Sequence, residues 1–369
     1  MEHVIPSEWF QDLHGGVLLG LVGVSMVALM FGADRLVESA SALARRLGVP
    51  EIIVGATIVS LGTTAPECAV SVMAAWEGNS GLALGNAVGS VIADTGLIFG
   101  LGCLLTRLPV NRFLLVRQGW VQFGSAVLLA GLCYVMWWLH GDSAVVPRWA
   151  GAMFLLLLVA YMFVSVRWSL KGEALEGGLE TDVTSSSSDE SESDEESQRP
   201  MVLLGVLLFG VVVVVLSSHV LIESVEVMAR RLSVPDVVLS ATLVAFGTSL
   251  PELVVGVTAI RRGHPELLVG NVIGADVLNV LFVVGASAIA AELPIVAPAT
   301  GPQAVADVFS REIFLRLHLP TMLLILLTFR CFIFRAIQLN TFQRWMGAPL
   351  VLGYVAFVIL NAFYGGGVS

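Results

Sequence analysis

Charged residues are scarce in this chain of 369 residues. Asp, Glu, Lys and Arg make up 13% of the sequence, whereas 56% of it is hydrophobic and the mean hydropathy is +0.88. A soluble domain carries about 25% charged residues, so the composition excludes an ordinary soluble fold. The formal charge of −10 does not describe one acidic surface, because ten of the 29 acidic residues lie between Glu173 and Glu196. The chain is predicted to be an all-α membrane protein.

Cysteine and histidine are also rare, and neither has the spacing of a known site. The four cysteines lie within apolar segments, which predicts that they are packing residues rather than disulfide or metal positions. They are Cys68, Cys103, Cys133 and Cys331. The six histidines are scattered, and no His-Glu-x-x-His or Ser/His pattern is present. The first fourteen residues are acidic and lack a small-residue cleavage site, so no signal peptide is expected.

Long apolar runs dominate what remains. A run of about 20 apolar residues can cross the hydrocarbon core of a membrane, and the sequence contains ten such runs. We expect spans at roughly 15–33, 50–76, 80–105, 115–139, 148–168, 201–221, 236–260, 266–291, 313–334 and 347–364. Loops after odd-numbered spans hold 14 of the 19 basic residues. Because basic loops stay in the cytoplasm, both termini are predicted to face outward.

Two segments of the chain are copies of one another. At an offset of 185 residues, 25 of the 67 positions from Asp34 to Gly100 are identical to their partners in the second half. The first copy enters from outside and the second, after five spans, enters from the cytoplasm. The sequence therefore predicts two inverted repeats of five helices, 1–170 and 201–369, with the substrate between them.

A polar segment, 171–200, joins the two repeats. It contains the run Thr184-Ser-Ser-Ser-Ser-Asp-Glu-Ser-Glu-Ser-Asp-Glu-Glu196 and lacks apolar residues for a core. We expect it to be a disordered cytoplasmic linker. A weak regulatory calcium-binding role is the alternative, although no spacing of a calcium loop is present.

Each copy carries a glutamate in the middle of an apolar span. The copies read Gly55-Ala-Thr-Ile-Val-Ser-Leu-Gly-Thr-Thr-Ala-Pro-Glu67 and Ser240-Ala-Thr-Leu-Val-Ala-Phe-Gly-Thr-Ser-Leu-Pro-Glu252. The proline in each motif removes a backbone hydrogen bond and leaves a carbonyl that needs a partner in the membrane. A carboxylate at the bilayer centre costs about 2.5–3.5 kcal/mol on insertion scales, which favours a functional role for both glutamates.

The oxygens of this motif pair suit a hard cation. Glu67 and Glu252 supply two carboxylates, and hydroxyls follow from Thr63, Thr64, Thr248 and Ser249. Such oxygen ligands are typical of Ca²⁺ or Na⁺ sites and not of softer metals. The two negative charges match one Ca²⁺, which is expected as substrate rather than as cofactor; no cofactor is predicted.

A second motif pair follows the first. The copies read Gly85-Asn-Ala-Val-Gly-Ser-Val-Ile-Ala-Asp94 and Gly270-Asn-Val-Ile-Gly-Ala-Asp-Val-Leu-Asn279. Glycines four residues apart permit close helix packing, and residues four apart share a face. Candidate ligands are Ser90, Asp94 and Asn279. Asn86 and Asn271 are either ligands or hydrogen-bond partners of the broken helices. Asp276, opposite Val91 in the repeat, either lines an ion path or makes a polar contact.

These residues resemble the α-repeats of the cation/calcium antiporter superfamily, which includes the sodium/calcium exchangers. The resemblance rests on both Gly-Thr-[Ser/Thr]-x-Pro-Glu motifs, both Gly-Asn-x-x-Gly motifs, ten spans and a polar central loop. It implies that Glu67 and Glu252 bind Ca²⁺ and also serve Na⁺. The archaeal exchangers have Asn in the first repeat and Asp in the second at the end of this motif, whereas this chain has Asp94 and Asn279. The counterpart of Ser90 in the second repeat is Ala275, so one hydroxyl ligand is lost.

The resemblance implies a secondary antiporter that exchanges Ca²⁺ for Na⁺ by alternating access at a midplane site. Alternatives are Ca²⁺/H⁺ exchange, with Glu67 or Asp94 carrying protons, potassium-dependent exchange, and a passive channel. In the potassium-dependent branch of the superfamily an acid occupies the position of Asn279, so the resemblance argues against potassium use unless Asp94 takes that role. An intramembrane aspartyl hydrolase is disfavoured because Asp94 and Asp276 occupy unequal repeat positions and neither follows Gly-x-Gly. We expect a bacterial inner-membrane location, the lipid bilayer and the ions as partners, no nucleic acid and no obligate protein partner.

Overall fold

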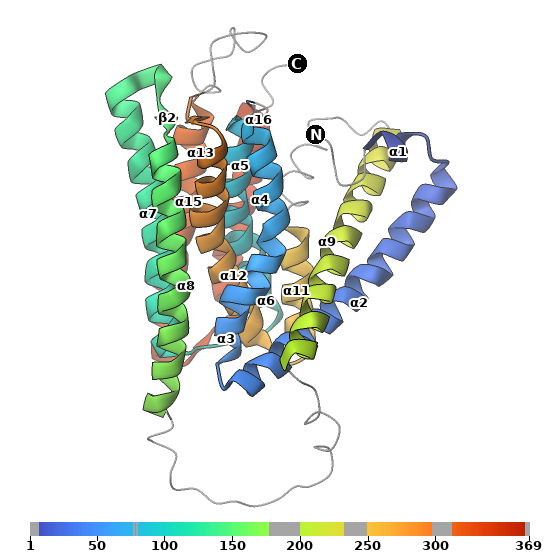
Figure 1. Ribbon diagram of the computed structural model, residues 1–369, viewed down its shortest axis with the longest axis vertical. Helices are drawn as coiled ribbons and strands as arrows, with labels where there is room; N and C mark the ends of the chain where they lie inside the picture. The colour runs from blue at the N-terminus through green and yellow to red at the C-terminus, as the bar shows by residue number, and fades with distance from the viewer. Residues whose placement is uncertain are drawn as a thin grey trace, which may run out of the picture.

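The computed structural model describes residues 7–76, 78, 80–176, 200–231, 249–296 and 312–365. Within these ranges the chain is mostly helical, and its helices run roughly parallel to one long axis (Figure 1). The first half contains α1 (Ser7–Gln11), α2 (Gly15–Leu47), α3 (Glu51–Val54), η1 (Gly55–Val59), α4 (Ser60–Trp76), α5 (Ser80–Ala93), η2 (Asp94–Phe99), α6 (Gly100–Leu105), β1 (Leu108–Pro109), α7 (Arg112–His140), η3 (Gly141–Ser143), β2 (Val145–Val146) and α8 (Arg148–Glu176).

The second half contains a similar succession of helices with short strands between them. Its elements are α9 (Pro200–Arg231), α11 (Leu250–Arg261), α12 (Pro265–Leu278), η4 (Asn279–Val284), α13 (Gly285–Ala290), β3 (Leu293–Pro294), η6 (Phe314–His318), α15 (Leu319–Leu339), β4 (Thr341–Phe342), η7 (Arg344–Met346) and α16 (Gly347–Gly365). The predicted linker, 171–200, lies outside the described residues over most of its length.

Eight helical units of the described chain are long and apolar enough to cross a membrane. They cover Gly15–Leu47, Ala83–Leu105, Arg112–Ser143, Arg148–Ser165, Pro200–Ser224, Pro265–Ala290, Phe314–Leu339 and Arg344–Tyr364. A bent pair within 51–76 makes a ninth. The predicted span 236–260 falls mostly outside the described residues, which resume at Ser249. The chain is thus a multi-pass helical membrane protein, and the expectation of ten spans stays a prediction.

Local sequence signals account for the helix ends and for the bend. The side chain of Asn111 caps α7 by accepting a hydrogen bond from the Leu114 N–H at 3.1 Å. Gly48 ends α2 with a φ of 64°, a conformation that glycine adopts without strain. The second span bends by 45° between Glu51–Ala65 and Glu67–Trp76, with Pro66 at the break. The bend lies where the motif predicts a broken helix.

Two short antiparallel strand pairs connect the halves of the chain. β1 pairs with β4, through Leu108 opposite Phe342, and β2 pairs with β3, through Val146 opposite Leu293. Because β1 precedes the long helix α7 and β2 follows it, the two pairs lie at opposite ends of the bundle. Each end is therefore closed by one strand from each half.

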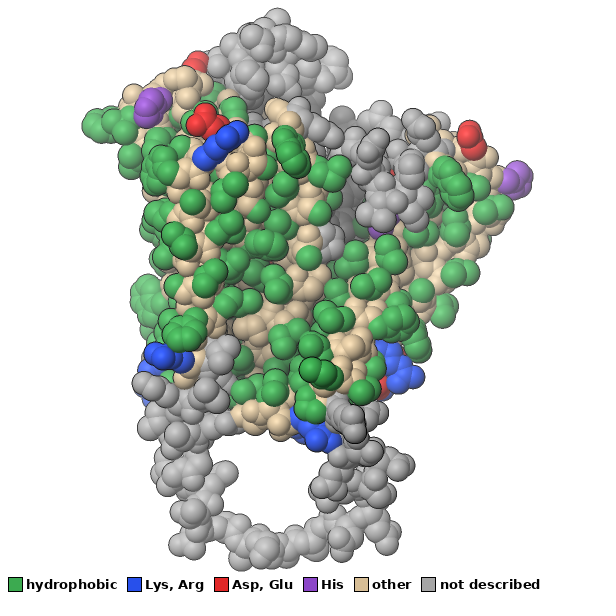
Figure 2. Space-filling model, viewed as in Figure 1, with side chains coloured by type: hydrophobic (Ala, Val, Ile, Leu, Met, Phe, Trp, Pro, Cys, Tyr) green, Lys and Arg blue, Asp and Glu red, His purple; other side chains and the backbone are tan. Residues whose placement is uncertain are grey.

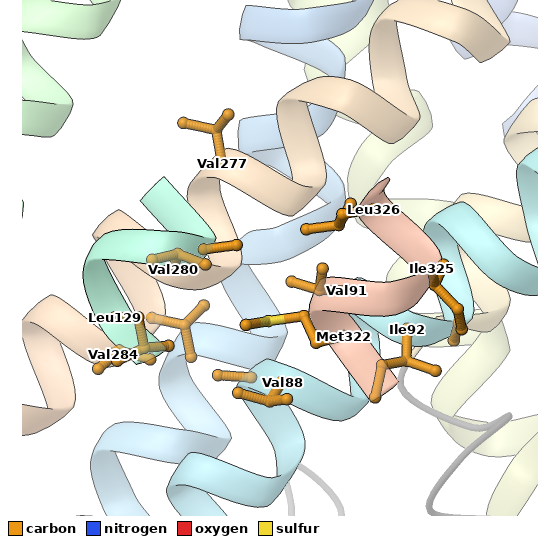
Figure 3. Packing of buried hydrophobic residues seen from close by; sticks show 14 of the residues in the cluster. Val88, Val91, Ile92, Leu129, Val277, Val280, Val284, Met322, Ile325 and Leu326 are labelled. Atoms are coloured by element: carbon orange, nitrogen blue, oxygen red, sulfur yellow. The ribbon is translucent and has the colours of Figure 1, made fainter. Parts of the chain in front are cut away.

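The helices form a bundle and a separate pair. A continuous apolar core joins α4 to α8 with α12 to α16, and Figure 3 shows part of it at close range. The labelled side chains come from α5, α7, α12, η4 and α15: Val88, Val91, Ile92, Leu129, Val277, Val280, Val284, Met322, Ile325 and Leu326. A second core packs α2 against α9 and joins this pair to α3, η1 and α11. In Figure 1 the pair leans away from the bundle towards its upper end.

Glycines bring α12 into backbone contact with the second span. A Cβ added to Gly270 would lie 2.1 Å from the Ile52 carbonyl oxygen, and one added to Gly274 would lie 2.4 Å from that of Ala56. The close packing predicted for the second Gly-x-x-x-Gly pair is confirmed. At Gly89, in the first pair, an added Cβ would meet no described atom within 4 Å. By the repeat, Gly89 corresponds to Gly274, and the counterparts of residues 52–56 are residues 237–241. These lie outside the described residues.

The outer surface is apolar along most of its height. Large side chains such as Val27, Trp138, Leu156 and Phe363 are exposed, as expected where lipid replaces water. In Figure 2 the visible face is covered by hydrophobic side chains, and basic side chains gather mainly near its lower end.

Candidate functional site

The two motif glutamates are both buried inside the protein. Glu67 on α4 accepts a hydrogen bond from the Ser90 hydroxyl at 2.9 Å through Oε1, and its Oε2 has no described partner. Glu252, in the first turn of α11, is fully buried, and neither of its carboxylate oxygens has a described hydrogen-bond partner. The negative charges of the two side chains are close enough to repel each other. The structure therefore brings the duplicated acids together, as the repeat predicts.

Hydroxyl groups surround these carboxylates. Thr64 and Ser249 are buried, and their hydroxyl oxygens have no described hydrogen-bond partner. The Thr63 hydroxyl donates to the carbonyls of Val59 and Ser60 at 3.2 and 3.3 Å, which leaves lone pairs on its oxygen. Ser249 lies close to Glu67, and Thr63 lies close to Glu252. Thr248 falls outside the described residues.

Asp94 and Asn279 meet across the repeat. The Asn279 amide donates to Oδ2 of Asp94 at 3.4 Å, while the other oxygen of each side chain has no described partner. Each of the two residues begins a short π-helix, η2 and η4, at equivalent positions of the two copies. A π-turn rotates the residues that follow it relative to an α-helix, and such turns are frequent at functional sites. The sequence motif contains no signal for these turns.

The two motif asparagines differ in their contacts. The Asn86 amide donates to the Ser71 hydroxyl at 2.9 Å, so it bonds a helix neighbour. Asn271 is fully buried, and neither its amide oxygen nor its nitrogen has a described partner. The structure thus leaves Asn271 available to an ion or water, whereas Asn86 already contacts α4.

Asp276 lies in a polar cluster that the motifs do not predict. Its Oδ2 accepts hydrogen bonds from the Thr95 hydroxyl and from the Gln122 amide, and its Oδ1 has no described partner. Thr95 follows Asp94 directly, but Gln122 comes from α7, outside the duplicated segment. Proximity to Asp94 could have suggested Thr95. The signal for Gln122 is a polar side chain within the apolar run 115–139, but that signal does not name its partner.

The arrangement can hold a hard cation with mixed oxygen ligands. Within the described ranges, no three His, Cys, Asp or Glu side chains form a metal-binding group. A cation between Glu67 and Glu252 would therefore also take hydroxyl, amide or backbone oxygens, as Ca²⁺ and Na⁺ do. Three of the cysteines, Cys68, Cys103 and Cys133, are buried and form no disulfide.

Polar contacts also hold the α2/α9 pair against the bundle. Arg262, which follows α11, contacts Asp34 at 2.8 and 3.0 Å and Glu38 at 2.8 Å, both on α2. The hydrogen bond with Asp34 raises the pKa of Arg262, whose guanidinium is charged at physiological pH. Nearby, the Ser41 hydroxyl donates to Glu51, and His264 lies 2.9 Å from the same carboxylate.

Comparison with known proteins identifies the family. The family model described as sodium/calcium exchanger protein matches residues 17–167 and 202–363, which is most of the chain. The chain belongs to the sodium/calcium exchanger family. The resemblance drawn from the motifs is thereby confirmed, and the family consists of transporters rather than enzymes.

Relatives of this exchanger-family protein match over most of their length. The sodium/calcium exchanger MaX1 of Methanosarcina acetivorans is 30% identical over 93% of this chain and 97% of its own. The putative antiporter CaxA of Alkalimonas amylolytica is 33% identical over 75% of this chain and 82% of its own. A solved structure of the sodium-calcium exchanger NCX_Mj, soaked with Na⁺ and Sr²⁺, shares the fold at 22% identity. It has a TM-score of 0.71 and covers 94% of this chain and 99% of that one.

Proposed function

We propose that the protein exchanges Ca²⁺ for Na⁺ across its membrane at a site formed by Glu67, Glu252 and the hydroxyl and amide oxygens around them. Membership of the exchanger family supports a cation/calcium antiporter. The observation that carries the specific site is Glu252, whose two carboxylate oxygens are buried without a described partner and face the charge of Glu67. A charge in that position is stable only with a cation or proton beside it.

Coupling follows if the two ions compete for the same oxygens. One Ca²⁺ balances both glutamates, and Na⁺ ions can replace it only by occupying those ligands. Thr63, Thr64, Ser249, Ser90, Asn279 and Asp94 provide the remaining oxygens. Thr248 joins them by its place in the motif. An empty site would leave repelling carboxylates in a dry interior, so the unloaded protein reorients poorly.

The alternating access that we propose rests on the inverted repeat. β1 and β3 begin 185 residues apart, the repeat offset, and each pairs with a strand that precedes the last helix of the other half. η2 and η4 also keep this offset. In this crossed pairing, equivalent strands of the two halves each pair with the opposite half. We expect it from two inverted five-helix halves, 1–170 and 201–369. The α2/α9 pair, which packs outside the main apolar core of the bundle, is the unit that slides against the ion site.

The excess of basic residues in alternate loops supports an orientation with the 171–200 segment in the cytoplasm and both termini outside. The shortness of the segment that joins the two halves supports a bacterial inner membrane rather than an organelle. In that orientation, inward Na⁺ would drive Ca²⁺ out of the cell.

Uptake of ⁴⁵Ca²⁺ into proteoliposomes tests the function. Vesicles loaded with Na⁺ are expected to accumulate Ca²⁺ when diluted into Na⁺-free buffer, whereas vesicles loaded with choline or K⁺ are not. A proton gradient is imposed separately in matched vesicles. Uptake driven by the proton gradient alone would contradict Na⁺ exchange and support a Ca²⁺/H⁺ antiporter.

A further inference from the structure

We propose that Asp276, Thr95 and Gln122 form a second cation site, beside the Glu67/Glu252 site, that holds one monovalent alkali cation. Asp276 is 1% exposed. Its Oδ2 accepts from both Thr95 and Gln122, while its Oδ1 is buried with no described partner. One oxygen of this carboxylate is therefore fully satisfied and the other is not.

This cluster lies outside the two-fold arrangement of the main site. The repeat partner of Asp276 is the apolar Val91, and Gln122 comes from α7, which contributes none of the ligands of the Glu67/Glu252 site. Asp276 precedes Asn279 by three residues, so the two side chains are about 60° apart around the helix. Asn279 bonds Asp94, whereas Asp276 faces η2 and α7.

The charges call for further neutralisation, by a proton or by a positive ion. Asp94, Glu67, Glu252 and Asp276 are all buried, and the charge of Asp94 interacts with those of the other three. One Ca²⁺ balances only two of these acids. Among the described residues, no Lys, Arg or His forms an ion pair with Asp276, and its hydrogen-bond partners Thr95 and Gln122 are neutral. An ionised buried carboxylate without a counter-charge is strongly unfavourable.

Unpartnered oxygens beside Asp276 and on the adjoining turn of α7 are suited to a cation. Asp94 repeats its pattern, with Oδ2 bonded to Asn279 and a buried Oδ1 that has no described partner. The Thr95 hydroxyl donates to Asp276, accepts from Gln122 at 3.3 Å and retains a lone pair. Gln118, one turn before Gln122 on α7, is fully buried with both amide atoms unpartnered among the described residues. These are hard oxygen ligands.

A single positive charge fits this site better than two. Asp94 is shared with the Glu67/Glu252 site, where its charge meets both glutamates. Only Asp276 contributes a carboxylate that belongs to this cluster alone. An ion held here does not compete with Ca²⁺ for the glutamates, so both can be bound at once. The inference depends on the proposed exchange function only for the role of this ion in coupling; its binding does not depend on that function.

Thermal unfolding of the purified protein in detergent tests the binding. The double variant Glu67→Gln, Glu252→Gln is used, because it lacks the charges of the main site. EGTA removes divalent ions. NaCl or KCl is titrated against choline chloride at constant ionic strength. We expect saturable stabilisation by at least one of the two alkali ions. Asp276→Asn, added to this background, is expected to raise the half-saturating concentration ~10-fold or more, because it removes the charged ligand.

Glu292→Gln on the same background is the matched control, since this acid is exposed and lies beyond the end of α13, next to β3. Stabilisation that is absent from the double variant, or unchanged by Asp276→Asn, would overturn the proposal. If the double variant does not fold, the same titration is made at saturating Ca²⁺ with the otherwise unmodified protein and with Asp276→Asn alone. An alkali effect that is equal in both would again overturn it. A failure of Na⁺-driven Ca²⁺ uptake would refute the exchange function and leave this binding result unaffected.

Discussion

Glu252 and Glu67 have the same motif but different surroundings. Glu67 receives a hydrogen bond from Ser90, whereas Glu252 receives none from a described side chain. The difference arises because the position of Ser90 is occupied by Ala275 in the second copy. The negative charge on Glu252 therefore depends more on a bound cation than that on Glu67.

Glu252→Gln should greatly reduce transport while the protein stays folded. We expect Na⁺-driven Ca²⁺ uptake to fall at least ~100-fold, since removing one partner of a buried charge pair costs about 3–5 kcal/mol. The cation-free variant should melt at a higher temperature than the unmodified protein, because a buried unpaired charge is gone. Uptake and thermal unfolding in EGTA are measured together, with Glu292→Gln as the control. Uptake that persists in Glu252→Gln would exclude this glutamate as a ligand.

The sequence predicts most of the candidate site because the motifs repeat. Equivalent positions in the two copies carry the same chemistry, and the structure places Glu67 beside Glu252 and Asp94 beside Asn279. It could not predict the surroundings of Asp276. Those depend on a contact with Gln122, on a helix without repeat identity, and on the π-turn at Asp94, whose register no side-chain pattern encodes.

At the scale of elements, α12 depends on two glycines for its position. Its backbone touches α3 and η1 at Gly270 and Gly274, and the next turns carry Asp276 and Asn279. Displacing this helix by even an ångström would separate Asn279 from Asp94. Packing between helices therefore sets the geometry of the ion ligands.

Gly270→Ala should damage both folding and transport. The added Cβ would lie 2.1 Å from a backbone oxygen of Ile52, so α12 must move away. We expect a loss of about 1–3 kcal/mol in the free energy of unfolding, or more, and a large loss of uptake. Gly131→Ala on α7 is the control, since its Cβ would meet no described atom within 4 Å. Equal melting temperatures of the two variants would argue against the close packing.

A second element-scale contact joins α2 to the bundle through Arg262. Its partners Asp34 and Glu38 are about 40% exposed (38% and 44%), so the contact adds little to overall stability. It does bias the position of the α2/α9 pair. Arg262→Ala is expected to weaken docking by about 0.2–1 kcal/mol and to raise the undocked fraction by up to about fivefold.

Spin labels at Val27 on α2 and Leu139 on α7, both exposed, report this motion. Their distance distribution should broaden in Arg262→Ala, while the melting temperature stays nearly constant. Arg335→Ala is the control, because this exposed arginine on α15 contacts Gln338 of its own helix. A distribution that does not change would show that the contact does not position the pair.

At the scale of the whole molecule, the number of spans decides on which side of the membrane each end lies. The described first half contains five spans when the bent pair is counted, and the described second half contains four. The predicted span at 236–260 would add the fifth. The acidic segment and the C-terminus lie on opposite sides of the membrane only if an odd number of spans separates them.

Protease sites inserted in the acidic segment and at the C-terminus test this topology. We expect the first to be cleaved in inside-out vesicles and the second in right-side-out vesicles. Cleavage of both from the same side would remove the span at 236–260 and, with it, the inverted arrangement.

The crossed strand pairs obey the geometry of an isologous dimer interface. In such an interface, patch A of one subunit meets patch B of the other, and the same contact occurs twice. β1 with β4 and β2 with β3 are these two contacts, formed here within one chain. An ancestral half-length chain could have closed both ends of the bundle by pairing with a second copy of itself. In such a dimer both ends of the bundle close without a covalent connection between the halves.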